Sequence, residues 1–298
     1  MSEESKDIAA ATAAPPAQAA EQVTSKADVK KLFEEDFATG LTPIYVNTLG
    51  KDFRFREITV MQQKSLSRIM IGNESRKDVI YDAQCQLVNQ ACADEGFDIY
   101  ALTEFDRIKL LIALYQANMF QRDVDFTCSE CGAKNKYRFD FDKTLSRLDA
   151  IDVSDERFQY QTKTCAFDFL VGYPSVKTVS AFHKQYCARN RAVGKAQSRV
   201  ADSMQNMEYV NLYIKGVDMT SASTGARKSI DLTQFTPADR EEILQMFPQD
   251  ALYAEDGVLK KVMDRYVKAI NDSFERHRCF QCGHVNEEGD IASPEGFF

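Results

Sequence analysis

Tryptophan is absent from the 298 residues of the sequence, and histidine occurs only three times. No glycine-rich phosphate loop precedes a predicted helix, and no nucleophile elbow is present. Three scattered histidines are too few and too badly placed for a catalytic triad, in which a histidine must lie beside the nucleophile. These absences predict that the protein is not an enzyme.

Long apolar runs are also missing. No stretch approaches the roughly 20 apolar residues that a membrane helix needs. The first residues, Met1–Glu21, are acidic and then rich in Ala and Pro, without the apolar segment of a signal peptide. Residues 1–25 are therefore predicted to be a disordered tail. Because 44% of the residues are apolar, we expect a real core. With its thiols reduced, the protein is expected to be soluble and intracellular.

Positive charge is scarce as well. Lys and Arg number 37 against 45 Asp and Glu, which gives a net charge of −8. Nonspecific binding to nucleic acid depends on Lys and Arg neutralising phosphates, so this balance argues against it. Basic residues do occur in the predicted helix over 175–207, but they form no continuous run and are best explained as a solvated helix face.

Two matched cysteine motifs are the most informative feature that is present. Cys128–Gly132 and Cys279–Gly283 both have the pattern C-x-x-C-G, and about half of the chain lies between them. Four thiolates suit a tetrahedral Zn²⁺ ion, and glycine can take the positive φ of a sharp turn after the second cysteine. The pattern therefore predicts one structural zinc ion. Its predicted ligands are Cys128, Cys131, Cys279 and Cys282.

Other interpretations of these cysteines have less support. A redox pair needs one reactive C-x-x-C in a βαβ context, and a disulfide framework suits a small secreted domain. His277 and His284 flank the second motif, which leaves a Cys₃His site as an alternative. A complete Cys₄ set has no open position for water and so excludes a catalytic zinc. The other cysteines are expected to be small buried hydrophobic residues: Cys85, Cys92, Cys165 and Cys187.

Periodic patterns predict an N-terminal part that is mainly helical and carries a β-hairpin. Two short strands, 43–46 and 53–56, flank a turn at 49–51. Apolar residues at spacings of three and four predict the helices, and Thr103 with Asp106 resembles a capping box. The predicted helices cover 28–37, 59–71, 75–93 and 103–119.

An alternating segment follows the first cysteine motif. Tyr137, Phe139 and Phe141 are predicted to face one side of a strand, and the charged residues between them the other side. A shorter segment after the second motif, residues 283–286 and then 290–291, is expected to join this strand. Together they would form one small sheet beside the metal.

Between the two motifs lies an insertion of domain size. It contains strand-like residues over 158–171, a long helix, a strand over 209–217 and a loop over 218–229. Thr236 and Pro237 then begin a helix as its cap and its first residue. A last helix leads to the second cysteine motif.

The sequence as a whole predicts an α+β fold in four parts. A disordered tail covers residues 1–25, and a mainly helical N-terminal domain covers 26–127. A split zinc ribbon, 128–145 and 275–298, is interrupted by an α+β insertion over 146–274.

The order of these features resembles that of the baseplate hub and hub-assembly proteins of contractile-tailed (T-even-type) phages. The resemblance covers residues 40–298. It is carried by the two C-x-x-C-G motifs, the alternating residues 137–142, the helix entry Tyr173–Lys177 and the segment Glu295–Phe298. It implies a non-enzymatic structural or assembly component of a phage tail baseplate hub, located in the virion or in the host cytoplasm during assembly. It implies other hub proteins as partners, with the tape-measure protein as a further candidate.

Two other classes of function stay open. A zinc-ribbon regulator would bind nucleic acid or polymerase. A metalloenzyme or thiol oxidoreductase would need an open metal position or a reactive thiol pair. The acidic charge of the chain favours a structural protein over the regulator.

The last two residues, Phe297 and Phe298, have two possible roles. They can insert as an apolar anchor into a pocket of a partner protein, or they can pack on the ribbon of their own chain. If they are an anchor, deleting both is expected to weaken partner binding in a pull-down and to leave the zinc content unchanged. Complex formation at the wild-type level by the truncated protein would contradict the anchor.

Overall fold

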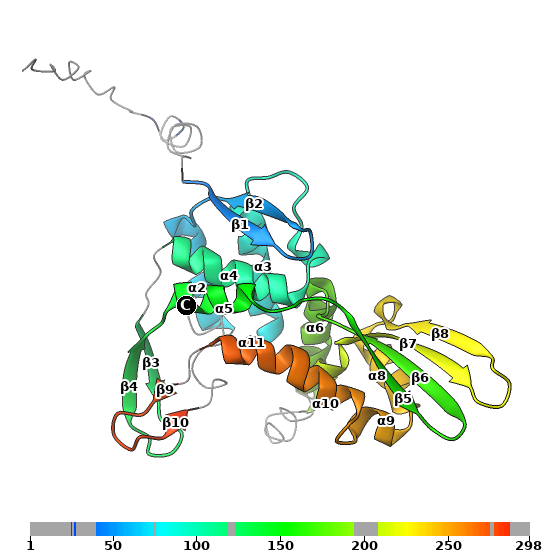
Figure 1. Cartoon of the computed structure of the whole chain (residues 1–298). Helices are drawn as coiled ribbons and strands as arrows, with labels where there is room; N and C mark the ends of the chain where they lie inside the picture. The colour runs from blue at the N-terminus through cyan, green and yellow to red at the C-terminus, as the bar shows by residue number, and fades with distance from the viewer. Residues whose placement is uncertain are drawn as a thin grey trace, which may run out of the picture. The chain divides into compact units, whose positions relative to one another are not determined.

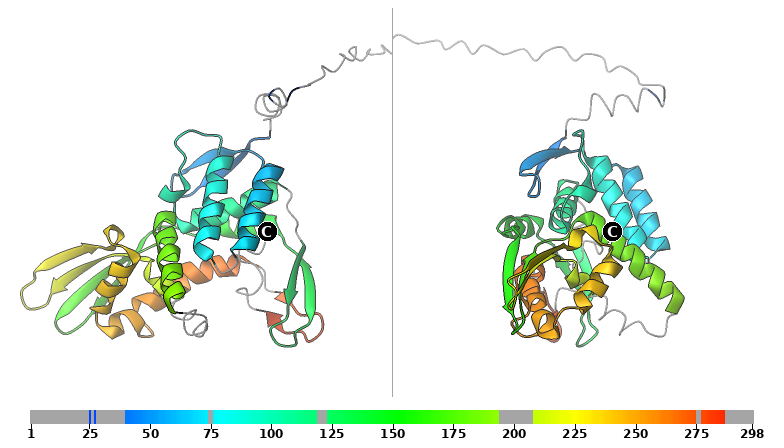
Figure 2. Two further views of the ribbon diagram at one scale, coloured as in Figure 1. Left: turned by 180° about the vertical axis from the view of Figure 1, so that it is seen from behind. Right: turned by 90° about the vertical axis from the view of Figure 1, so that its right-hand side faces the viewer.

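The mixed α+β class predicted from the sequence is confirmed (Figures 1 and 2). The chain divides into two compact units, Met1–Gly40 and Leu41–Phe298, and the helices and strands discussed below belong to the second. Among the described residues, no helix combines the length and the apolar character needed to cross a membrane. Apart from residue 25, the tail predicted over 1–25 lies outside the described residues, as does the helix predicted over 28–37. The computed structural model describes residues 25, 27, 40–73, 76–118, 123–193, 208–274 and 277–286.

An antiparallel hairpin begins the second unit. Its strands are β1 (Thr42–Val46) and β2 (Lys51–Phe55), close to the predicted positions. The turn between them contains Gly50, whose φ of +62° is readily adopted by glycine. Alternation along β2 buries Phe53 and Phe55, so the hairpin presents one apolar face to the core.

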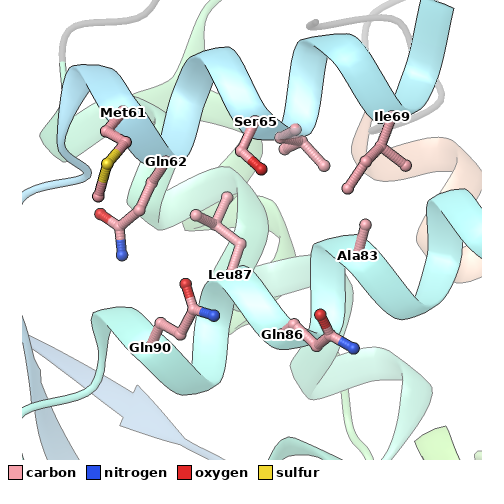
Figure 3. A pocket seen from close by; sticks show the side chains of 9 residues that line it. Met61, Gln62, Ser65, Ile69, Ala83, Gln86, Leu87 and Gln90 are labelled. Carbon is pink, nitrogen blue, oxygen red and sulfur yellow. The ribbon is translucent and has the colours of Figure 1, made fainter. Parts of the chain in front are cut away.

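Three helices follow the hairpin where the sequence predicts them: α2 (Val60–Gly72), α3 (Lys77–Ala91) and α4 (Glu104–Ala117). Helix α2 buries only Leu66 and packs against α3, and a pocket of about 250 Å³ lies between the two (Figure 3). Helix α4 is the opposite case, because nearly every side chain from its first residue to Tyr115 is buried.

Helix α4 also carries charged residues into the core. Arg107 Nη2 lies 2.6 Å from Glu104 Oε1, and both side chains are almost fully buried. The Glu104 carboxylate accepts a hydrogen bond from the Tyr81 hydroxyl on α3, and the Arg107 guanidinium lies 4.1 Å from the centre of the Tyr81 ring. Because a buried charge without its partner is strongly destabilising, this group fixes α4 against α3.

A four-stranded antiparallel sheet with the order β5-β6-β7-β8 forms part of the second half of the unit. Phe167 and Phe169 of β6 pack against Phe247, which follows α8, with ring centroids 5.5 and 5.8 Å apart. These rings therefore attach the helical segment after the sheet to one of its faces. The strands are β5 (Glu156–Gln161), β6 (Cys165–Val171), β7 (Ile214–Ser221) and β8 (Arg227–Asp231).

The helices of this half lie beside the sheet and lead back toward the cysteines (Figure 1). Helix α8 begins as predicted, with Thr236 as its cap and Pro237 at its first position. The last helix is also as predicted, except that a π-helical turn interrupts its middle. The elements are α6 (Val176–Val193), the turn η4 (Leu232–Gln234), α8 (Pro237–Gln245), α9 (Gln249–Tyr253), α10 (Val258–Val262), the π-helical turn η5 (Met263–Val267) and α11 (Lys268–Ser273).

The hairpin, α4 and the sheet share one hydrophobic core. Two backbone hydrogen bonds join its halves directly after the short turn η2 (Ile99–Ala101). The Glu104 amide donates to the Pro174 carbonyl at 2.8 Å, and the Val176 amide donates to the Leu102 carbonyl at 2.9 Å. The start of α4 is therefore fixed to the start of α6.

The alternating segment after the first cysteine motif is only partly a strand. Strand β4 (Lys134–Arg138) ends before Phe139, and α5 (Phe141–Asp149) then begins with Asp140 as its cap. The Asp140 side chain accepts a hydrogen bond from the Lys143 amide at 3.0 Å. Phe139 and Phe141 are both buried as predicted, because the strand-to-helix junction keeps both rings on the core side.

The prediction for residues 209–229 is wrong in part. Residues 209–211 are helical, and the loop predicted over 218–229 contains the end of β7 and the start of β8. Residues 222–229 are all exposed. A hairpin with so little burial has no apolar alternation, which explains why its sequence resembles a loop. Residues 158–171 likewise form two strands, β5 and β6, joined by a turn.

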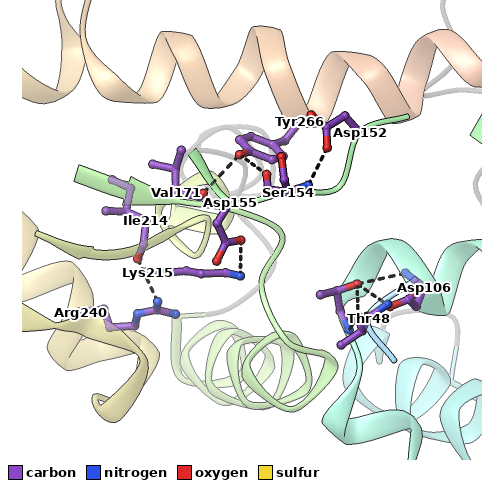
Figure 4. A network of polar contacts seen from close by, with 11 residues as sticks. Thr48, Asp106, Asp152, Ser154, Asp155, Val171, Ile214, Lys215, Arg240 and Tyr266 are labelled. Atoms are coloured by element: carbon purple, nitrogen blue, oxygen red, sulfur yellow. Dashed lines mark hydrogen bonds and ion pairs between the residues drawn. The ribbon is translucent and has the colours of Figure 1, made fainter. Parts of the chain in front are cut away.

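The carboxylate of Asp106 holds the β1–β2 turn on the start of α4. It accepts hydrogen bonds from the Asn47 amide at 2.8 Å, the Thr48 amide at 3.1 Å and the Thr103 hydroxyl at 2.9 Å, and also from the Thr48 hydroxyl (Figure 4). Asp106→Asn replaces one acceptor oxygen by a donor in a side chain that is only 1% exposed. We expect it to lower the free energy of unfolding by about 2–3 kcal/mol in urea denaturation.

Asp239→Asn is the matched control for this prediction. Asp239 stands in the same Thr-x-x-Asp arrangement at the start of α8, but it is exposed. Its replacement is expected to cost less than about 0.5 kcal/mol. Equal losses for the two variants would contradict the role assigned to Asp106.

Candidate metal centre

The two cysteine motifs form the tips of two separate hairpins, which lie side by side in Figure 1. The first hairpin pairs β3 (Asp123–Thr127) with β4, and the second pairs β9 (His277–Arg278) with β10 (Val285–Asn286). The prediction of one joint sheet is therefore wrong. In each hairpin the tight C-x-x-C-G turn places the second strand directly beside the first. The strands therefore pair within their own hairpin and not with the other one.

Both tips have the same backbone geometry. In the first, the Cys128 amide donates to the Ala133 carbonyl at 2.9 Å, and the Cys128 carbonyl accepts from the Gly132 amide at 2.9 Å. The second tip repeats these two hydrogen bonds around Cys279 at 2.8 and 2.9 Å. The φ angles of Gly132 and Gly283 are +70° and +73°, so each tip uses the conformation that glycine allows.

The four cysteine sulfurs meet between the tips. Cys128 Sγ lies 3.7 Å from Cys282 Sγ, Cys131 Sγ lies 3.6 Å from Cys279 Sγ, and all four sulfurs lie within 4.8 Å of one another. A tetrahedron of sulfurs about 2.3 Å from a zinc ion has edges of about 3.8 Å. A disulfide bond is about 2.05 Å long, so these sulfurs are not bonded to each other. The spacing fits one tetrahedral metal ion.

The electrostatics favour a thiolate at the first cysteine of each tip and oppose one at the second. Cys128 and Cys279 are 2% exposed, whereas Cys131 and Cys282 lie at the surface. Backbone amides directed at the sulfurs, that of Cys131 above all, lower the pKa of Cys128, and the amide of Cys282 lowers the pKa of Cys279 to about 6. At the second cysteine of each tip, desolvation and the neighbouring thiols outweigh the backbone hydrogen bond, and they raise the pKa of Cys131 to about 12 and that of Cys282 as well. Four thiolates this close repel one another, so their joint ionisation requires a cation among them.

Two asparagines connect the tips across the cluster. Asn286 Oδ1 accepts a hydrogen bond from the Ser129 amide at 3.0 Å, and Asn135 Oδ1 accepts one from the Phe280 amide at 3.0 Å. Each asparagine belongs to one hairpin and binds the residue after the first cysteine of the other. Asn135 Nδ2 also lies 3.6 Å from the sulfur of Cys279. The two halves are therefore related by an approximate two-fold symmetry.

Sequence reasoning missed these asparagines, although their signal is present. Both motifs extend to the pattern C-x-x-C-G-x-x-N, which ends at Asn135 in the first and at Asn286 in the second. Both side chains are buried, with 5% and 1% exposed. An asparagine can accept one hydrogen bond and donate others from a single buried position, which the crossing between hairpins requires.

The flanking histidines lie beside the cluster rather than in it. The ring of His277 stacks on Tyr137 with centroids 3.4 Å apart, and His284 Nε2 lies 3.3 Å from Ser129 Oγ. Among the residues that the structure describes, the group of possible metal ligands contains four cysteines and no histidine. The Cys₃His alternative therefore has no support.

The remaining predicted residues have different outcomes. Phe297 and Phe298 lie outside the described residues. Of the single cysteines, Cys85 and Cys187 are buried as predicted, and burial raises the pKa of Cys85 to about 12. The other two are only half-buried: Cys92 and Cys165.

Comparison with known proteins adds one finding. The family described as T4 bacteriophage base plate protein matches residues 42–298. The chain belongs to this family. No curated protein and no solved structure matches it. The family match begins with β1 and includes both cysteine hairpins, and it confirms the resemblance to phage baseplate proteins. Membership in the T4 base plate family supports a structural role in the phage tail, with other baseplate components as partners.

We expect the purified chain to bind one Co²⁺ ion with the absorption spectrum of a four-thiolate tetrahedral site, because the sulfurs already have the required spacing. Cys279→Ser is expected to abolish this spectrum. Cys165→Ser, which changes a half-buried cysteine of β6 outside the cluster, is the matched control and should bind Co²⁺ like the wild type. An octahedral spectrum, or equal binding by Cys279→Ser, would contradict the site.

Proposed function

We propose that the chain is a non-enzymatic structural or assembly component of the baseplate hub of a contractile phage tail. We further propose that a single structural Zn²⁺ ion, bound by Cys128, Cys131, Cys279 and Cys282, holds its two cysteine hairpins together as a split ribbon. The family match supports the baseplate, and the meeting of four sulfurs supports the metal. The protein would act in the virion, or in the host cytoplasm during assembly.

The zinc proposal rests mainly on the fact that the four cysteines come from two distant parts of the chain and meet in space. Cys131 and Cys279 are 148 positions apart in the chain, yet their sulfurs lie 3.6 Å from one another. The strands β9 and β10 have two residues each, and a hairpin of this size is not stable by itself in water. Zinc binding would therefore supply folding free energy to the second hairpin. Its role is that of a clamp on a distant segment.

A structural role agrees with the chemistry of the cluster. Four cysteine ligands complete the tetrahedral coordination of zinc and leave no position for water or substrate. The cluster can therefore bind and orient a segment, but it has no place for a catalytic step.

The second tip also offers a rigid contact for a partner protein. Phe280 stands between the two cysteines of this tip and is 78% exposed, while its backbone amide is held by Asn135. Exposed aromatic residues on a fixed backbone are frequent anchors of protein interfaces. If another hub protein binds this tip, zinc binding would support assembly by holding the contact surface in place.

The proposal is tested by purifying the tagged chain from cells that produce the phage. We expect other baseplate components in the eluate and one zinc ion per chain by metal analysis. The same preparation is then mixed with DNA and RNA in a shift assay at increasing salt. Recovery without baseplate components, together with nucleic-acid binding that weakens steeply with salt, would favour a zinc-ribbon regulator and contradict the proposal.

A further inference from the structure

A large cleft lies where α6 begins, between that helix and the segment formed by η4 and the start of α8. Its volume is about 800 Å³, which is within the usual range of ligand-binding pockets and could hold a ligand as large as several side chains. Three basic residues line it, Lys177, Lys215 and Arg240, together with many hydroxyl groups. No Asp or Glu belongs to the lining among the described residues. In a chain with a net charge of −8, this is a local concentration of positive charge.

Arg240 is the most unusual member of the lining. Only 2% of the residue is exposed, and its one hydrogen bond is from Nη2 to the Ile214 carbonyl at 3.0 Å (Figure 4). Its Nε has no hydrogen-bond partner, and no carboxylate of the described residues forms an ion pair with it. Burial lowers the pKa of Arg240 to about 10, although the charge of nearby Asp231 opposes this shift, and the guanidinium is still charged at neutral pH. A buried charge without an ion pair at contact distance is costly.

The other two basic residues of the cleft, Lys215 and Lys177, differ in whether a carboxylate of the chain neutralises them. Lys215 Nζ lies 2.6 Å from Asp155 Oδ1, so its charge is neutralised within the chain. Lys177 is exposed on the first turn of α6, and no described carboxylate forms an ion pair with it. The cleft therefore has one buried and one exposed positive charge available for a ligand.

Two helix starts lie at the cleft, and the start of α6 adds to its positive potential. Helix α6 has 18 residues and α8 has nine, and the first residues of both line the cleft. The Ser175 hydroxyl accepts from the Thr178 amide, and the Thr236 hydroxyl accepts from the Asp239 amide, so both caps are fixed in place. The amino end of a helix carries a partial positive charge that stabilises anions. Asp239 in the first turn of α8 offsets that helix start, so the start of α6, together with Arg240 and Lys177, makes the cleft complementary to negative charge.

We propose that this cleft binds an acidic peptide segment of a partner protein, with one carboxylate of the segment paired with Arg240. The size of the cleft favours a segment over a small free anion, because a single carboxylate or phosphate would occupy only a small part of 800 Å³. The lining also includes Phe235, which is 41% exposed, and Ala181, which can contact the apolar parts of a peptide. The identification of the partner as a baseplate component rests on the proposed function. The acidic character of the ligand is inferred from the cleft alone.

The test uses the purified full chain and a fluorescein-labelled hexaglutamate peptide, with binding measured by fluorescence anisotropy at low salt. Lys177→Glu is expected to weaken binding by roughly tenfold or more, because it reverses the exposed charge of the cleft. A Glu at the start of α6 is compatible with the helix, so the variant should fold. Lys64→Glu, on the exposed side of α2, makes the same charge change outside the cleft and should bind like the wild type. Hexaglutamine should not bind.

Arg240→Met separates ligand binding from a purely structural role. Because the removal of a buried charge without an ion pair offsets the loss of the hydrogen bond to the Ile214 carbonyl, we expect its melting temperature to be close to that of the wild type. Peptide binding by the same variant should be lost. A lower melting temperature with peptide binding retained would show that Arg240 serves the fold, and it would overturn the proposal.

Two further outcomes would also overturn it. The first is absence of hexaglutamate binding by the wild-type chain. The second is binding of inorganic phosphate in place of the peptide, which would make the cleft a site for a small anion. These measurements use the purified chain alone, so their failure would leave the recovery of baseplate components with the tagged chain as a separate result.

Discussion

Burial of α4 on all its sides is the constraint on which the rest of the unit depends. A charged residue in such a helix must find its partners inside the protein. Glu104 pairs with Arg107 and Tyr81, and Asp106 binds the turn after β1. As a result, α3 and the turn after β1 both contact the start of α4. Thr48 and Thr103, which donate to Asp106, also line the cleft beside α6, so the same requirement shapes the candidate binding surface.

The cysteine hairpins follow a different physical rule. They are too small for a hydrophobic core of their own, and their strands pair only within each hairpin. What joins them is a set of side chains that cross from one to the other, namely four sulfurs and the amides of Asn135 and Asn286. Since the amide contacts repeat under an approximate two-fold symmetry, each hairpin completes the other.

Residue patterns within a few positions of one another predicted much of this structure. Most features that the sequence did not predict depend on contacts between residues far apart in the chain. Thr103 and Thr236 mark helix starts because each hydroxyl accepts a hydrogen bond from the backbone amide three residues later, a local pattern that a sequence displays directly. The C-x-x-C-G motifs are equally local. Phe139 and Phe141 are buried by what surrounds them, so their alternation could not show where β4 ends and α5 begins. Nothing adjacent in sequence indicates that Arg240 is buried, because its carbonyl partner is Ile214, 26 positions away.

The separation of the two cysteine pairs has a consequence for synthesis. Between Cys131 and Cys279 the ribosome must add 148 residues, which takes on the order of ten seconds at roughly 5–20 residues per second. During this interval the first pair of thiols exists without the second, and the sheet and most helices are already available to fold. A metal ion that reached the first pair early would meet only two of the four cysteines. The four-cysteine cluster is therefore completed late in the synthesis of each new chain, and oxidation of Cys128 or Cys131 in that interval would prevent its completion.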